Sequence, residues 1–148
     1  MMISTELARA LRDSGLVWRP RAGDAFRIDL VEADSDLFVL SDMTVEAHEF
    51  STGTVIGFNG TTEWALDSVA LDDALWLPRE DQLRELLAAA FVRLERVDST
   101  EVIDAVTLES SAYRLTALVG AQSRVFEAPD AADAYARALL ALLDSIAE

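Results

Sequence analysis

The sequence predicts an α+β fold in which an antiparallel sheet is combined with three helices, in the order α-β-β-β-(β)-α-β-β-β-α. Two patterns predict it. Apolar residues recur at helical spacing near the start, middle and end of the chain, and between these segments apolar and polar residues alternate, as in strands. No linker, repeat or low-complexity segment divides the 148 residues, and 51% of them are hydrophobic. We therefore expect one domain, residues 1–148, large enough to bury its own core.

The first helix is expected over Thr5–Ser14. Ser4, or Thr5 itself, suits the N-cap, and Gly15 suits the stop. Leu7 and Leu11 lie one turn apart and form its apolar stripe.

Period-two alternation then predicts a series of strands. Phe26, Ile28 and Leu30 form the first, and the apolar run 37–40 predicts a strand covered on both faces. Alternation over 43–48 leads through a hairpin loop into a strand over 54–58, and Asn59-Gly60 is a strong turn signal. Residues 61–77 fit no single period, so we expect one short strand or helical turn there.

The second half begins with a helix expected from a first-turn proline, Pro78, to about Arg96, because apolar residues recur at helical spacing as far as Leu94. Residues 102–109 and 113–119 predict a hairpin around Ser110-Ser111. A short strand over 125–127 and a helix from about Asp130 complete the order.

Composition excludes several classes of site. The chain has 27 acidic and 12 basic residues, a net charge of −15, which argues against binding to nucleic acid or to an anionic membrane. All the basic residues are arginine, so chemistry that needs lysine is absent; without cysteine and with one histidine, thiol catalysis and common zinc sites are absent too. We expect no cofactor.

The location expected from the sequence is cytoplasmic. The N-terminus lacks the basic and apolar regions of a signal peptide, and the longest apolar run, residues 86–92, is too short to cross a bilayer.

A polar site could involve His48 and Glu46, which share one face of a predicted strand. A carboxylate beside an imidazole can orient a general base, but a solvated strand residue is the alternative. Asp34 and Asp36 have the spacing of the first calcium ligands, but Phe38 stands where the third is needed, so we expect no metal.

Candidate partner-binding residues are Trp64, Trp76 and Trp18, which lie near the ends of predicted elements; Trp64, after a polar stretch, is the strongest candidate. Packing in the core is the alternative for all three. Leu140 belongs to a second apolar face of the last helix. That face could contact a partner or a twin subunit, or the helix could be buried within the domain.

Three stretches, GLVWRPRAGDAF (15–26), IGFNGTTEWALDSV (56–69) and ALWLPREDQLREL (74–86), resemble a family of small actinobacterial proteins. Members sometimes carry a pilus-assembly label, whose namesake is a longer P-loop ATPase. Since this chain has neither a P-loop nor a lysine, the resemblance implies no such activity and no site residues. In element order alone, the chain is similar to dimeric type III secretion chaperones and to small acidic immunity proteins.

The function we expect is a non-enzymatic, acidic protein-binding module, chaperone-like or immunity-like. Its partner would be a protein, such as a basic one that the acidic chain attracts, or a second copy in a homodimer. The alternative is a small enzyme or small-ligand-binding protein that uses converging carboxylates.

Overall fold

The computed structural model describes residues 2–28, 37–39, 46–50, 53–57, 68–70 and 74–147. The chain divides into two compact units; unit 1 is Met1–Leu16 with Arg79–Glu148, and unit 2 is Val17–Pro78. The α+β class, the antiparallel strands and the three helices are confirmed. That the two units make one domain stays a prediction. Within the described residues, no helix is long and apolar enough to cross a membrane.

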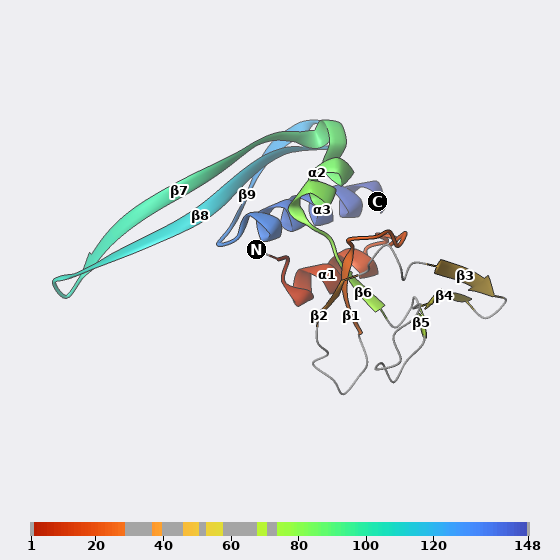
Figure 1. The fold of residues 1–148 in the computed structure, drawn as a ribbon. Coiled ribbons are helices and arrows are strands. Elements are labelled where there is room, and N and C mark those ends of the chain that lie inside the picture. The colour runs from red at the N-terminus through yellow and green to blue at the C-terminus, as the bar shows by residue number, and fades with distance from the viewer. Residues whose placement is uncertain are drawn as a thin grey trace. The chain divides into compact units, whose positions relative to one another are not determined.

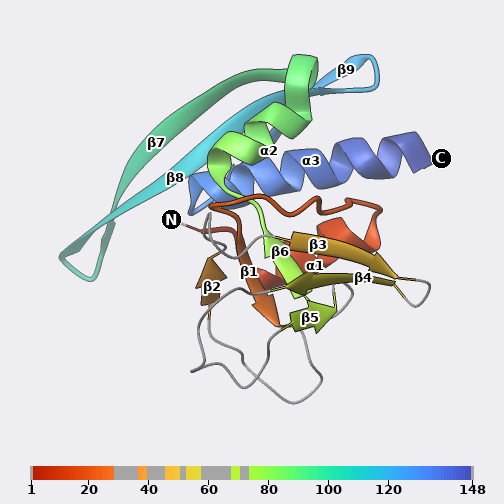
Figure 2. The ribbon, with the colours of Figure 1, turned by 45° about the vertical axis from the view of Figure 1, so that its right-hand side comes forward.

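Unit 1 is a three-stranded antiparallel sheet with helices on one face (Figures 1 and 2). The strand order is β7-β8-β9, and α3 packs against β8 and β9, while α1 and α2 pack against α3. The elements are α1 (Thr5–Asp13), α2 (Glu80–Leu87), the 3₁₀ turn η2 (Ala88–Ala90), β7 (Phe91–Ile103), β8 (Val106–Val119), β9 (Gln122–Ala128) and α3 (Ala131–Ala147).

The core of unit 1 lies between the sheet and α3. Leu115 of β8 is fully buried, and the Phe91 ring of β7 stacks on Tyr135 of α3 with centroids 5.8 Å apart. The Arg84 guanidinium of α2 lies 3.8 Å from the centre of the Phe91 ring. Small side chains, including those of Ala134 and Ala138, let α3 approach the strands closely.

Helix α1 agrees with the sequence prediction to within one residue. The Ser4 hydroxyl accepts a hydrogen bond from the Leu7 amide, which caps the helix, and Gly15 follows it with a φ of 106°. Two hydrogen bonds fix α1 parallel to α3: the Ser4 amide donates to Asp133 Oδ1 at 2.7 Å, and the Ser14 hydroxyl donates to Asp144 Oδ1 at 3.1 Å.

Helix α2 is much shorter than predicted. It begins at Glu80 with Arg79 as N-cap, so Pro78 precedes the cap instead of occupying the first turn. It ends at Leu87, and residues predicted as its last turns form the start of β7. A register shift in β7 between Phe91 and Arg93 places Phe91 and Leu94, three residues apart, on the same face of the strand. Because of this bulge, Phe91 and Leu94 have the spacing of apolar residues on one face of a helix.

The predicted hairpin around Ser110-Ser111 is also wrong. The turn lies at Asp104-Ala105, and the two serines pair within the strands with Ser99 and Asp98. The last strand and the last helix, β9 and α3, are confirmed near their predicted positions.

Unit 2 contains two three-stranded antiparallel sheets, ordered β2-β1-β6 and β3-β4-β5. Its core is an aromatic cluster in which the Trp18 ring stacks on Trp76 and packs against Phe26, which in turn stacks on Phe38. The strands are β1 (Ala25–Ile28), β2 (Leu37–Val39), β3 (Glu46–Phe50), β4 (Gly53–Gly57), β5 (Ser68–Ala70) and β6 (Ala74–Leu77).

Several predictions for unit 2 can be compared with these strands. The β3–β4 hairpin is confirmed, with Phe50 paired to Gly53. Strand β2 is an edge strand with Leu37 and Val39 exposed, so the prediction that it is covered on both faces is wrong. Segment 61–77 contains two strands, β5 and β6, where one short element was expected. The predicted turns at 34–36 and at Asn59-Gly60 lie outside the described residues.

Candidate functional site

The most distinctive feature of unit 1 is a two-stranded arm, residues 97–112, formed by the outer parts of β7 and β8. Strand β9 pairs with β8 only from Val119 back to Tyr113, so β7 and β8 continue beyond it as a pair (Figure 1). Seven residue pairs, from Val97–Ala112 to Ile103–Val106, form the arm. At about 3.3 Å per residue it is roughly 20 Å long.

The arm ends in a two-residue turn built without glycine. Asp104 and Ala105 have φ angles of 50° and 63°, the left-handed conformation that the tightest hairpin turns require at both central positions. Alanine adopts this conformation at a cost, and Asp-Ala is not a strong turn signal. The position of the turn, and therefore the length of the arm, could not be predicted from the sequence.

Apolar side chains change faces between the base of the sheet and the arm. We call the face that carries α3 the helix-side face, and the opposite one the far face. At the base, the apolar residues Phe91, Leu94 and Leu115 lie on the helix-side face. In the arm the far face carries most of the apolar side chains, namely Val97, Ile103, Val106, Leu108 and Ala112.

The same alternation makes the helix-side face of the arm polar, with Val102 its one large apolar residue. A hydrogen bond across the far face, 2.7 Å between the Ser99 and Ser110 hydroxyl oxygens, confirms that paired residues share a face. A ribbon surrounded only by water would need no apolar face. An exposed apolar face of this kind is typical of a surface that takes part in an interaction.

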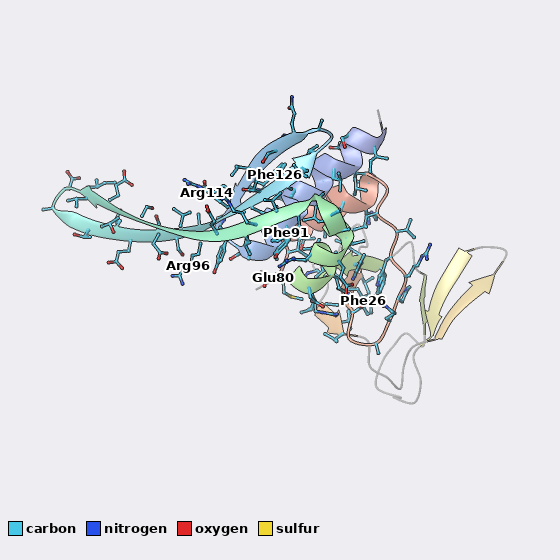
Figure 3. The ribbon with its side chains drawn as sticks, turned by 90° about the horizontal axis from the view of Figure 1, so that it is seen from above. Phe26, Glu80, Phe91, Arg96, Arg114 and Phe126 are labelled. Carbon is cyan, nitrogen blue, oxygen red and sulfur yellow. The ribbon has the colours of Figure 1, made fainter. Side chains whose placement is uncertain are left out.

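Every side chain from Asp98 to Ser111 is exposed. Val106 is 56% exposed on the far face, and Val102 is 67% exposed on the other. In Figure 3 no helix of unit 1 lies beside the outer end of the ribbon. An uncovered two-stranded hairpin is marginally stable in water, so covering this face would also stabilise the arm.

The arm is acidic, whereas the base of the sheet, residues 91–96, 113–119 and 122–128, carries four arginines and two glutamates. The charged residues between positions 97 and 112 are all acidic, namely Asp98, Glu101, Asp104 and Glu109, and Arg96 at the base pairs with Asp98.

On the far face of the base, Arg93 pairs with Glu95 and Arg114 pairs with Glu127. The hydrogen bond and charge of Glu127 raise the pKa of Arg114, so this guanidinium stays charged. Within this sheet, the net negative charge therefore lies on the arm.

Two of the predicted partner-binding tryptophans lie in the aromatic cluster of unit 2. Trp18 is only 7% exposed, and its Nε1 donates to the buried Asp24 carboxylate at 2.9 Å. Trp76 is half-buried and stacks on Trp18. Both positions agree with the alternative of core packing, and a partner-binding role for them stays a prediction.

The remaining predicted residues are not brought together into one site by the described structure. Trp64 lies outside the described residues. His48 and Glu46 lie on β3, opposite Val55 and Gly57 of β4. Leu140 is half-buried in α3, a helix that packs against β8, β9, α1 and α2, and a partner-binding role for it stays a prediction.

Acidic groups in the described ranges do not converge on a metal. No three of their histidine or carboxylate side chains are placed to hold one. Several carboxylates instead pair with arginines at the surface, as Asp81 does with Arg79 and Asp98 with Arg96.

Compared with known protein families, curated proteins and solved structures, the chain matches none of them. One sequence signal could have indicated the arm: with the turn placed at Asp104-Ala105, the apolar residues of the two strands change from one face of the sheet to the other.

Proposed function

We propose that the protein is a non-enzymatic, acidic binding module that holds a protein partner on its β7–β8 arm. The observation that carries the proposal is the far face of the arm, which is apolar although it is exposed. Exposed apolar surface bordered by charge is typical of protein interaction sites. We place this activity in the cytoplasm, the location expected from the sequence.

The charge of the chain supports a basic partner. A net charge of −15 accelerates the encounter with a positively charged surface and disfavours other acidic proteins. In this mechanism the acidic residues steer the partner, and the apolar side chains of the arm then hold it. Charge at the rim of an interface contributes more to the association rate than to affinity, so the two groups have separable roles.

The direct test is affinity capture from the native lysate with salt-graded elution, comparing two baits. One bait is the full chain, and the other has residues 98–111 replaced by Asn-Gly, which joins Val97 to Ala112 through a tight turn. We expect the full chain to retain a stoichiometric basic protein that salt releases, and the shortened chain to lose it. Circular dichroism of the shortened chain controls for its fold.

Two results would contradict the proposal. A full-length bait that retains no partner would remove the binding function. A partner retained equally by both baits would show that the arm is not where binding occurs.

A further inference from the structure

We propose that the partner element that covers the far face of the arm is a basic amphipathic helix. This inference rests on the proposed function and adds the conformation and chemistry of the bound segment. The face it would cover is a flat apolar surface on a two-stranded ribbon, interrupted by Glu101 and by the Ser99–Ser110 pair.

The position of the apolar side chains favours a helix over an added strand. A strand that joins the free edge of β7 forms main-chain hydrogen bonds, but it leaves Val106 and Leu108 uncovered, because they point out of the sheet plane. An element that buries them must lie across the face, and a helix can do so with its own main-chain hydrogen bonds satisfied. Helix α3 covers the helix-side face of this same sheet.

Length agrees with this assignment. A helix that spans the roughly 20 Å of the arm needs about 14 residues at 1.5 Å per residue. Its leucine-like residues, spaced three and four apart, would lie over the apolar ends of the face, around Val97 and around Val106.

Charge selects a basic helix rather than a second copy of this chain. Of the four carboxylates of the arm, Glu101 lies on the far face and Asp104 lies in the turn at its end, whereas Asp98 and Glu109 lie on the helix-side face. No basic residue lies between positions 97 and 112, so two far faces packed together would bring their Glu101 carboxylates into one interface with no cation from either arm. Arginine or lysine beside the apolar stripe of a helix would instead pair with Glu101 and with Asp104.

The test uses a fluorescently labelled peptide of about 16 residues with leucine along one helical face and arginine elsewhere. Fluorescence anisotropy measures its Kd for the full chain. Control peptides replace arginine with glutamate, or scramble the leucines so that they no longer share a face. We expect the full chain to bind the first peptide and neither control.

Two matched substitutions then test which face of the arm binds the peptide. Val106→Asp and Val102→Asp each add one negative charge to the same end of the arm, on opposite faces. We expect Val106→Asp to weaken binding more than about tenfold, because its carboxylate would be buried under the helix, and Val102→Asp to leave it within about twofold. Leu108→Ala, which adds no charge, should weaken binding as well.

The outcomes separate this inference from the proposed function. If shortening the arm abolishes peptide binding but the two aspartate variants behave alike, the helix on the far face is wrong and binding by the arm stands. If the shortened chain binds fully, both are wrong. A dimer in sedimentation that Val106→Asp dissociates would show that a second copy covers the face, and would overturn the proposal.

Discussion

The buried carboxylate of Asp24 holds together two parts of unit 2. It is 1% exposed, and its Oδ2 accepts hydrogen bonds from Trp18 Nε1 and from the Arg21 amide at 3.0 Å. The same oxygen thus closes the loop before β1 and satisfies the indole of the aromatic cluster.

Replacing Asp24 with alanine would leave these donors without that acceptor. We expect Asp24→Ala to lower the free energy of unfolding by about 1–3 kcal/mol, and Asp24→Asn, which keeps one oxygen, by less. Urea unfolding followed by tryptophan fluorescence measures both. The exposed Asp13→Ala is the control, and equal stability of Asp24→Ala and Asp13→Ala would show that the bonds to Asp24 are not needed.

Leucines at two positions of β8 should separate stability from binding. Leu115 is fully buried, and Leu108 is exposed on the far face of the arm. We expect Leu115→Ala to cost about 2–5 kcal/mol of unfolding free energy, since it leaves a cavity. Leu108→Ala should leave stability nearly unchanged and weaken peptide binding. Similar losses of stability in both variants would contradict the exposure of the arm.

Single elements differ in how well their sequences predict them. Helix α1 could be predicted almost to the residue because its cap, stripe and stop are all local. Helix α2 could not, because the bulge in β7 gives Phe91 and Leu94 a helical spacing. The arm was missed for a related reason: its turn lacks glycine, while Ser110-Ser111 resembles a turn but forms ladder pairs.

The turn of the arm gives a prediction at this scale. Ala105→Gly removes the strain of a left-handed alanine and should stabilise the arm by about 1 kcal/mol. Hydrogen exchange of amides in residues 97–112 should slow. Ala112→Gly, in the strand of the same arm, should have the opposite effect. Faster exchange in Ala105→Gly would show that the turn differs from the one described.

At the scale of the whole molecule, the binding surface that we propose on the arm differs from the tryptophans that the sequence suggests, whose partner-binding role stays a prediction. Sequence reasoning placed partner contacts at tryptophans because isolated bulky rings are typical anchors. Trp18 instead packs in a core, and the strongest candidate surface comes from aliphatic residues whose shared face depends on strand register. Register requires long-range pairing, which a single sequence does not reveal.

Net charge gives a prediction for the molecule as a whole. With a charge of −15, the association rate with the arginine–leucine peptide should fall steeply as salt rises from low to physiological strength. The dissociation rate should change little, because the apolar contacts are not screened. Stopped-flow anisotropy measures both rates, and a salt-independent association rate would contradict electrostatic steering.

The central claim, that partners bind on the arm, is tested most directly by hydrogen–deuterium exchange of the full chain with and without the arginine–leucine peptide. Covering the far face should protect amides of residues 97–112 in β7 and β8, with little change in α1, in α3 or over residues 17–28. Protection confined to those other segments, with the arm unchanged, would contradict the claim.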